Sequence, residues 1–371
     1  MPERTPLFFA TAAKGTEPLL RDELHELGLP RVRADRGGVH FGASERDAYQ
    51  ACLWSRIALR ILGPLAELDC PDEAALYDGV RQLEWSRVLD AGRTLAVRAA
   101  CRSSRLTHTQ FIAQKTKDAV VDQLRDRAGT RPSVDRDSPD VLIFVHLVRD
   151  RATVYLDYGG ESLHEHGFRK EHGVAPIRET LAAALVRFSG WDGESPLVDP
   201  MCGSGTLLLE AGLWAARRAP GLARQRFGFE RWRSFDDGAR RMLADLRAAA
   251  RAAARPLQAT LRGSDADASV LEMARANALR AGLPLELEAA PLAEVTPRAE
   301  RGALVANPPY GERLAQSEGL PRELGALLRR FASCDRALIV PRGMRLAPES
   351  DRYLMVHNGP LECELRRYDA R

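Results

Sequence analysis

The run Asn307-Pro308-Pro309-Tyr310 joins a side-chain amide, two prolines and an aromatic ring directly after the apolar stretch 303–306. Neither proline has a backbone N–H, and each holds the residue before it in an extended conformation. The Asn307 amide oxygen and nearby carbonyls are therefore preset acceptors for the two N–H groups of a nucleobase amine, and Tyr310 offers a flat surface for stacking. A structural turn would explain Asn-Pro-Pro alone, but not the ring after a strand, so we interpret the run as functional.

A glycine-rich turn, Asp199-Pro-Met-Cys-Gly-Ser-Gly-Thr206, follows a second apolar run, 196–199. Gly203 and Gly205 permit tight backbone geometry and close approach of a ligand, and the N-terminus of the helix expected next favours negative charge. The spacing matches neither the dinucleotide fingerprint nor the P-loop. The turn thus indicates a nucleotide-like ligand other than NAD or ATP, although a purely structural turn stays open at this point.

A third element, Gly263-Ser-Asp-Ala-Asp267, ends the next expected strand. In doubly wound folds an acid at the carboxyl end of the second strand can accept hydrogen bonds from a pair of ribose hydroxyls. Asp265 lies nearest the strand and is the candidate for that role. Asp267 is interpreted as the N-cap of the following helix.

Together these elements resemble S-adenosylmethionine-dependent methyltransferases that modify an amino nitrogen. Further runs, in order along nearly the whole chain, are similar to the bacterial 23S rRNA guanine-N2 methyltransferase family. They are Arg36-Gly-Gly-Val39, Ala51-Cys-Leu-Trp-Ser55, Lys117-Asp-Ala-Val120, Arg131-Pro-Ser-Val-Asp135, Gly160-Glu-Ser-Leu-His164, Gly228-Phe-Glu-Arg-Trp232 and Asn358-Gly-Pro-Leu-Glu-Cys363.

The resemblance implies methylation of the exocyclic N2 of a guanosine in 23S rRNA. The expected cofactor is S-adenosylmethionine, and its expected ligands are Asp199, Met201, Cys202, Gly203, Gly205, Thr206, Asp265 and Ala266. The residues expected to be catalytic are Asn307, Pro308 and Tyr310. Relatives often place an acid after the third strand to bond the adenine amino group; here the run reads Ala289-Ala-Pro-Leu292, so backbone or apolar adenine contacts are expected.

Elements that would position these residues are visible in the second half of the chain. Apolar runs at 196–199, 258–265, 285–288, 303–307 and 336–340 alternate with helical stretches, which is typical of a parallel α/β sheet. Two final runs, 353–356 and 361–365, are too close for a helix between them and should pair antiparallel at the sheet edge. The fold class is therefore α/β, a Rossmann-like domain with a seven-stranded, mostly parallel sheet.

The first half indicates an α+β arrangement. Thr16 and Ser44 are predicted to cap helices, a hairpin is expected at Gly37-Gly38, and 141–147 and 153–158 are expected to form an antiparallel pair. The resemblance implies a ferredoxin-like segment followed by a THUMP RNA-binding domain. We expect the boundaries 1–60, 61–160, a linker at 161–175 and a methyltransferase domain at 176–371.

Composition limits the alternatives. The 371 residues carry 54 basic and 51 acidic side chains, so a nucleic acid must be held by local patches. Predicted RNA contacts are Pro309, Lys115, Lys117, Arg169 and Lys170.

No apolar run approaches the roughly 18 residues of a membrane span, and a cytoplasmic location without membrane contact is expected. Six cysteines form no C-x-x-C pair, and no metal is expected; His164, His166 and His172 are interpreted as linker residues or RNA contacts.

Several functions stay open at this level. Asn-Pro-Pro-Tyr also occurs in enzymes that methylate DNA adenine or protein glutamine, but the RNA-binding-like first half argues against both. A tRNA guanine-N2 methyltransferase would share nearly every feature. A noncatalytic RNA-binding factor in ribosome assembly is the alternative from another class. The expected partner is RNA, foremost 23S rRNA or a large-subunit precursor; the oligomeric state is open.

Overall fold

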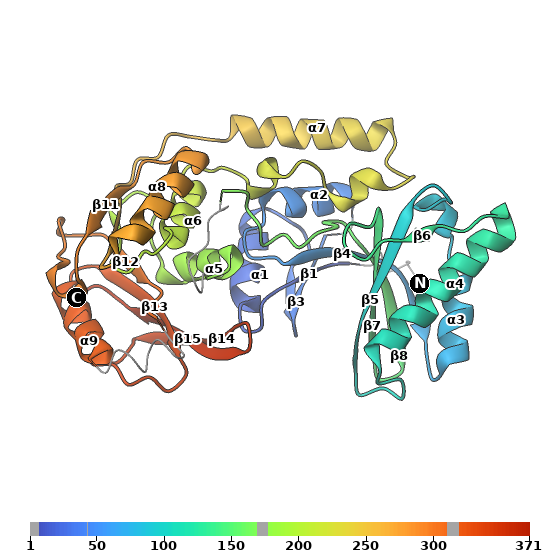
Figure 1. Cartoon of the computed structure of the whole chain (residues 1–371), viewed down its shortest axis with the longest axis horizontal. Coiled ribbons are helices and arrows are strands. Elements are labelled where there is room, and N and C mark those ends of the chain that lie inside the picture. Colours follow the sequence, from blue (N-terminus) through green and yellow to red (C-terminus); the bar gives the residue numbers. More distant parts are fainter. Residues whose placement is uncertain (1–6, 43, 169–176, 310–318) are drawn as a thin grey trace.

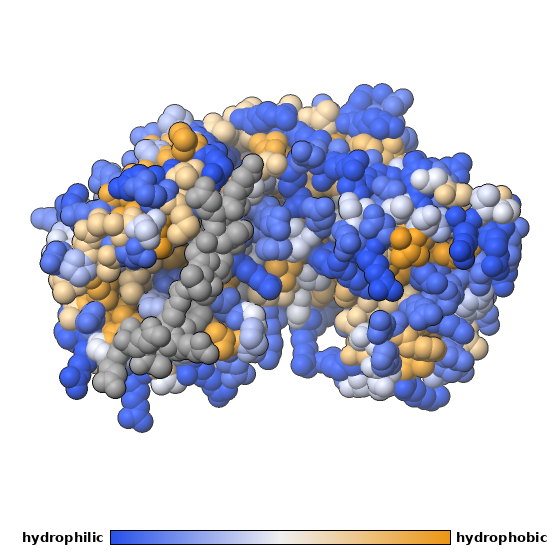
Figure 2. Space-filling view, viewed as in Figure 1, coloured by the Kyte–Doolittle hydropathy of each residue, from blue (hydrophilic) through white to orange (hydrophobic). Residues whose placement is uncertain are grey.

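Two β-sheets, one in each half of the chain, organise the protein (Figure 1). The computed structural model describes residues 7–42, 44–168, 177–309 and 319–371. On the face shown in Figure 2, hydrophilic residues predominate, and a notch indents the lower edge of the view. No helix in the described part is long and apolar enough to cross a bilayer.

The first sheet has eight strands in the order β2-β3-β1-β4-β8-β7-β5-β6. Its strands are β1 (Phe8–Thr11), β2 (Arg33–Asp35), β3 (Gly38–Phe41), β4 (Arg60–Asp69), β5 (Thr94–Arg102), β6 (Ser133–Val134), β7 (Val141–Val148) and β8 (Arg151–Asp157). The helices of this half are α1 (Glu17–Glu26), α2 (Glu45–Trp54), α3 (Glu73–Arg81) and α4 (Thr109–Ala128), with a 3-10 turn at Trp85–Arg87.

Strand β4 makes this sheet continuous. Residues 60–62 pair with β1, whereas residues 62–69 pair with β8. The expected boundary between residues 60 and 61 therefore falls inside one strand, and the two expected N-terminal domains share a sheet. Their exact limits stay a prediction.

Local sequence explains how several elements begin. Ser44 forms a capping box at α2, because its Oγ accepts from the Asp47 N–H at 3.3 Å and its own N–H donates to Asp47 Oδ2 at 3.1 Å, as predicted. The predicted side-chain cap at Thr16 is wrong: the Thr16 hydroxyl donates to the Ala13 carbonyl instead. The Glu17 carboxylate accepts from backbone N–H groups of the flanking loops and so orders this end of α1.

The second sheet has seven strands in the order β11-β10-β9-β12-β13-β15-β14, and the prediction of a mostly parallel sheet is confirmed. Its strands are β9 (Leu197–Asp199), β10 (Leu261–Asp265), β11 (Glu286–Ala289), β12 (Ala303–Ala306), β13 (Asp335–Pro341), β14 (Arg352–Asn358) and β15 (Leu361–Tyr368). The β14–β15 hairpin is antiparallel at the edge, as expected. The helices are α5 (Glu179–Ser189), α6 (Thr206–Ala215), α7 (Asp237–Ala252), α8 (Ala268–Ala281) and α9 (Leu320–Arg330).

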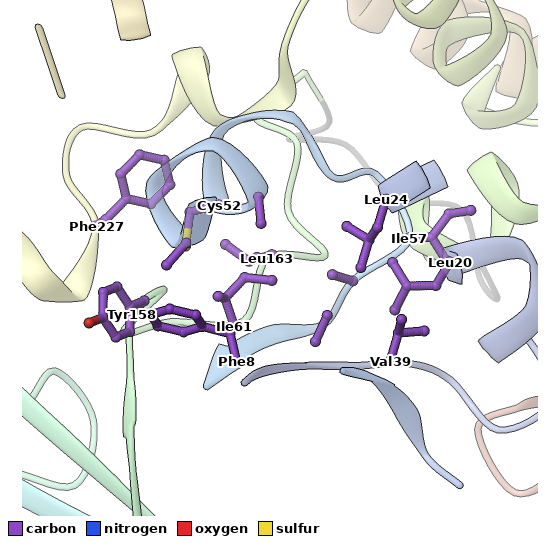
Figure 3. Packing of buried hydrophobic residues seen from close by; sticks show 14 of the residues in the cluster. Phe8, Leu20, Leu24, Val39, Cys52, Ile57, Ile61, Tyr158, Leu163 and Phe227 are labelled. Atoms are coloured by element: carbon purple, nitrogen blue, oxygen red, sulfur yellow. The ribbon is translucent and has the colours of Figure 1, made fainter. Parts of the chain in front are cut away.

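A segment between α6 and β10 reaches back to the first half. It contains 3-10 turns at Pro220–Ala223 and Gly228–Arg231 and then α7, which runs along the top of the molecule beside α2 (Figure 1). Phe229 stacks on Tyr49 with ring centroids 4.0 Å apart, and Trp232 meets the Tyr158 ring edge-on at 4.7 Å. Figure 3 shows Phe227 of this segment near Cys52 and Tyr158. Run 228–232 thus joins the two halves through a buried aromatic cluster.

Buried polar groups join the halves at a second place. Glu23 accepts from the Ser55 hydroxyl at 2.6 Å and the Arg56 backbone N–H at 2.9 Å, and Arg56 Nη1 lies 3.2 Å from Glu210 Oε2 on α6. Burial raises the pKa of Glu23, while these hydrogen bonds act in the opposite direction. His166 Nδ1 lies 2.6 Å from Glu210 Oε1, with its side chain 1% exposed. The interpretation of His166 as an RNA contact is therefore wrong, because the ring is enclosed in this network.

Candidate active site

The three predicted motifs meet at one edge of the second sheet. Strands β10, β9 and β12 are neighbours and parallel, with Asp199 opposite Gly263 and Leu304 opposite Val198. The loops that follow them therefore leave from the same edge, a few ångströms apart at about 4.8 Å per strand. After β9 the chain continues to β10 on one side, and β12 is added on the other side. Ligands of doubly wound sheets bind at such a reversal of strand order.

The glycine loop has the backbone that the sequence predicted. Gly203 has φ of 51° and Gly205 has φ of 82°, the left-handed region that glycine adopts without strain. A Cβ atom at Gly203 would meet nothing within 4 Å, so the loop leaves open space there. Gly205 occupies the N-cap position of α6 and leads into Thr206.

Hydrogen bonds hold this loop to the neighbouring strand. The Gly203 N–H donates to Asp265 Oδ2 at 3.0 Å, and the Cys202 N–H donates to the Ser264 carbonyl at 2.9 Å. Asp265 Oδ1 accepts from the Asp267 N–H at 3.1 Å, which leaves each carboxylate oxygen with a further lone pair. Asp267 caps α8 by accepting from the Ser269 N–H at 2.9 Å, as interpreted from the sequence.

Asp199 is the electrostatically unusual group of the site. It is buried, and burial raises its pKa to about 8; the Met201 N–H bond lowers the pKa and the Asp265 charge raises it. Neither Asp199 nor Asp265 forms an ion pair with a described residue. Two neighbouring carboxyl groups without a cation fit a positively charged ligand, which would restore the ionised form of Asp199. Burial likewise raises the pKa of the Cys202 thiol, which disfavours the thiolate form that a nucleophile needs.

Asn307 presents the acceptor that the sequence predicted. Strand β12 is buried along its length, and Asn307 follows it directly at the carboxyl edge. The Asn307 Oδ1 atom is buried and has no hydrogen-bond partner among the described residues. Pro308 is buried and Pro309 half-buried beside it, and neither has an N–H to donate to that oxygen. Tyr310 lies outside the described residues.

One positioning residue was not predicted. Asn277 on α8 is fully buried, and its Nδ2 donates to the Ser204 carbonyl at 3.1 Å, which fixes the glycine loop to α8. The signal was present in the sequence, since Asn277 is a polar residue on the apolar face that α8 shares with Ala274, Ala278 and Ala281.

Of the predicted RNA contacts, Pro309 lies at this edge beside Asn307, whereas the two described lysines do not. Lys115 and Lys117 lie on α4, which Figure 1 places at the opposite end of the long axis from β12. The Lys115 Nζ lies 5.4 Å from the centroid of the Tyr77 ring, and Lys117 pairs with Asp118. Arg169 and Lys170 lie outside the described residues.

Met201 and Thr206 flank the glycines, and Ala266 is exposed beyond Asp265, so every described cofactor candidate does lie at the carboxyl edge.

Three family models match the chain in succession. Residues 7–62 match the RlmL ferredoxin-like domain, residues 70–157 match the THUMP domain, and residues 166–341 match the RMKL-like methyltransferase domain. Among the described residues, no group of three or more His, Cys, Asp or Glu side chains could hold a metal ion.

Whole-chain comparisons agree with these matches. The chain is 43% identical over 376 residues to the ribosomal RNA large subunit methyltransferase K/L of Methylococcus capsulatus, covering 98% of this chain and 51% of that protein. It thus spans about half the length of this curated relative. A putative methyltransferase solved in complex with SAH is 30% identical, with 99% and 98% of the two chains covered and a TM-score of 0.88. A predicted N6-adenine-specific DNA methylase from Listeria monocytogenes is 28% identical, with 99% and 96% covered and a TM-score of 0.87.

Proposed function

This chain belongs to the family of RMKL-like methyltransferases with an RlmL ferredoxin-like domain and a THUMP domain, and we propose that it methylates the exocyclic N2 of a guanosine in 23S rRNA. The methyl donor in this proposal is S-adenosylmethionine. Support comes from the SAH-bound structure of one relative and from the similarity to a second relative, which is a ribosomal RNA large subunit methyltransferase.

The residues at the carboxyl edge suit such a donor. Asp199 and Asp265 are two carboxyl groups without a cationic partner among the described residues, and the cofactor carries positive charge on its sulfonium and amino groups. The open space at Gly203 admits the ligand close to the backbone, and Asp265 retains lone pairs for the ribose hydroxyls. Asp199, Met201, Cys202, Gly203, Gly205, Thr206, Asp265 and Ala266 would form the cofactor site.

Asn307 would orient the amine that receives the methyl group. S-adenosylmethionine supplies an electrophilic methyl carbon, so that an N–C bond forms as the S–C bond breaks and the methylated amine passes a proton to solvent. The N2 lone pair of guanine is delocalised into the ring, so alignment and stabilisation of developing positive charge matter most. The Asn307 amide oxygen and the Pro308 carbonyl would accept the two N–H bonds of the amine, while Tyr310 would stack on the base.

The first half would hold the RNA. A THUMP match next to the catalytic half favours RNA over DNA and over protein glutamine as the substrate. Lys115, Lys117, Arg169 and Lys170 would contact phosphates, and Pro309 would border the base. No residue in this scheme acts as a strong base, because the amine becomes acidic on methylation.

The buried Oδ1 of Asn307, which has no hydrogen-bond partner in the described part of the chain, carries the proposal, because a buried acceptor without a partner is costly unless a ligand supplies the donor. The test is methyl transfer by the purified chain from labelled S-adenosylmethionine to unmodified 23S rRNA, 16S rRNA, tRNA and DNA, with mass spectrometry of the released nucleosides. We expect N2-methylguanosine in 23S rRNA alone. The same product only in tRNA would replace the substrate, N6-methyladenine in DNA would overturn the proposal, and failure to bind S-adenosylmethionine would indicate a noncatalytic RNA-binding factor.

A further inference from the structure

A groove of about 1040 Å³ lies between the first half and the edge hairpin of the second sheet. One wall is the loop after β1, with Lys14 and Gly15, and the other is formed by β14, β15 and the loop after β13. The walls are in close contact at its end, because the His357 N–H donates to the Lys14 carbonyl and Lys14 Nζ lies 3.1 Å from His357 Nε2. The reaction proposed above assigns no role to this groove.

Strand register places the groove on the same edge as Asn307. Ala306, the residue before Asn307, pairs with Leu338, and β13 ends three residues later at Pro341. Pro341 lies opposite Cys363 of β15, which lies opposite Val356 of β14. The end of the groove at Arg342 and His357 therefore borders the carboxyl edge, and β13, β15 and β14 lie about 5, 10 and 14 Å from β12.

The groove wall on β14 carries an exposed aromatic ring. Tyr353 is 66% exposed, and Met355 and His357 follow at alternate positions on the same face of the strand. Residues between them, such as Val356, point to the opposite face and join the core. A large exposed ring on a sheet face is a platform on which an unpaired base can stack.

Two cations of the groove are available to phosphates. Arg342 and Arg366 are paired with carboxylates of their own hairpin, Glu362 and Glu364. Lys14 and Arg345 form no ion pair with a described residue, and Arg345 is exposed.

Among the lining carboxylates, Glu349 also forms no ion pair with a described residue. Two unpaired cations and one unpaired carboxylate leave the groove with a net positive charge. Single-stranded nucleic acids are held by this combination of an aromatic ring with a cationic groove, whereas the bases of a duplex are already stacked on one another.

We propose that this groove binds the single-stranded RNA segment next to the nucleotide that enters the Asn307 site, with Tyr353 stacking on a base and Lys14 and Arg345 contacting phosphates. The inference rests on the proposed function for the identity of the RNA, and it adds residues outside the cofactor and amine sites. It predicts that the substrate is unpaired on one side of the methylated nucleotide.

The test measures binding of the full chain to a labelled oligouridine of about 15 nucleotides, within the site sizes of single-strand binders, by fluorescence anisotropy. Tyr353→Ala should weaken binding about fivefold or more at every salt concentration, as expected for loss of one stacked base. Lys14→Gln and Arg345→Gln should weaken binding and lower the slope of log affinity against log salt by about 0.7 each, one phosphate contact per side chain. Binding to an RNA duplex of about 16 base pairs should not change in any variant.

Matched controls lie outside the groove. Arg241→Gln on α7 removes an exposed arginine that has no ion pair with a described residue, and Leu279→Ala removes an apolar side chain that is 85% exposed on α8. Both should bind oligouridine like the unmodified chain, and all five variants should keep their melting temperature and their affinity for S-adenosylmethionine.

The outcomes separate this inference from the proposed function. If the chain methylates RNA while the three groove variants bind oligouridine like the controls, the groove inference is overturned. Equal losses for the duplex and the single strand would also overturn it. If the groove variants lose oligouridine binding but no RNA is methylated, the groove is supported as an RNA site and the proposed reaction fails.

Discussion

Replacing Asn307 with alanine should separate stability from catalysis. In the folded chain without substrate, Oδ1 is buried and unpartnered among the described residues, and such an atom costs about 1–3 kcal/mol. Asn307→Ala removes that cost together with some packing, so we expect the free energy of unfolding to stay the same or to rise by up to about 2 kcal/mol. Methyl transfer should fall by about 10²–10³, the usual effect of deleting one preorganised hydrogen-bonding group that acts in the transition state.

Asn277→Ala is the matched control, because it also removes a buried amide. The Asn277 Nδ2 donates to the Ser204 carbonyl, so its loss leaves a buried acceptor unpaired and should destabilise the fold by about 1–3 kcal/mol. Urea unfolding measures both stabilities, calorimetry measures S-adenosylmethionine affinity, and single-turnover transfer measures the chemical step. The reasoning is refuted if Asn307→Ala destabilises the chain as much as Asn277→Ala does, or if its transfer rate is unchanged.

Three further predictions concern the site and its support. The pKa of Asp199 is raised to about 8, so stability without ligand should fall as pH rises from about 4 to 8, by at most about 1.4 kcal/mol per unit, and Asp199→Asn should abolish this fall in urea titrations. Gly203→Ala should lower the free energy of unfolding by about 1–2 kcal/mol, because residue 203 has a positive φ. It should also weaken S-adenosylmethionine binding strongly in calorimetry, because the added Cβ enters the open space assigned to the ligand. Unchanged affinity would contradict that assignment. Phe229→Ala should lower the free energy of unfolding by about 3–5 kcal/mol in urea titrations, since the ring is buried on Tyr49, and a loss below about 1 kcal/mol would contradict its role.

The sequence predicted for a physical reason that the three motifs meet at one edge of the second sheet; the roles of their residues stay a prediction. Parallel strands deliver their carboxyl ends to one edge, so motifs that follow three apolar runs must meet if those runs are neighbours in the sheet. Asp199, Asp265 and Asn307 satisfy this condition, and the N-cap role of Asp267 follows from residues only two positions apart. Such predictions depend on local geometry and on strand direction alone.

Long-range packing was beyond reach of the same reasoning. Run 228–232 was singled out by resemblance, but its contact with Tyr49 and Tyr158 depends on how the two halves dock, which no local pattern encodes. For His166, the RNA-contact alternative was wrong, because its burial against Glu210 depends on the same docking and is not visible in the local sequence. The side-chain cap expected at Thr16 was wrong because Pro18, at the second helical position, has no N–H to donate and the Thr16 hydroxyl donates to the Ala13 carbonyl instead.

Docking of the two halves bears directly on how RNA would meet the methyl donor. The buried Arg56 guanidinium donates to Glu210 of α6 and to the Arg218 carbonyl just after α6. These hydrogen bonds attach the first half to the helix that begins at the glycine loop. A buried ion pair repays its desolvation only in a well-fitted geometry, and misaligned arrangements would leave charges unpaired. The interface therefore strongly favours one arrangement, and with it one distance between the Lys14 wall and the cofactor loop. In the proposed reaction, an RNA held by the first half would then meet the Asn307 edge at a fixed separation from the cofactor loop.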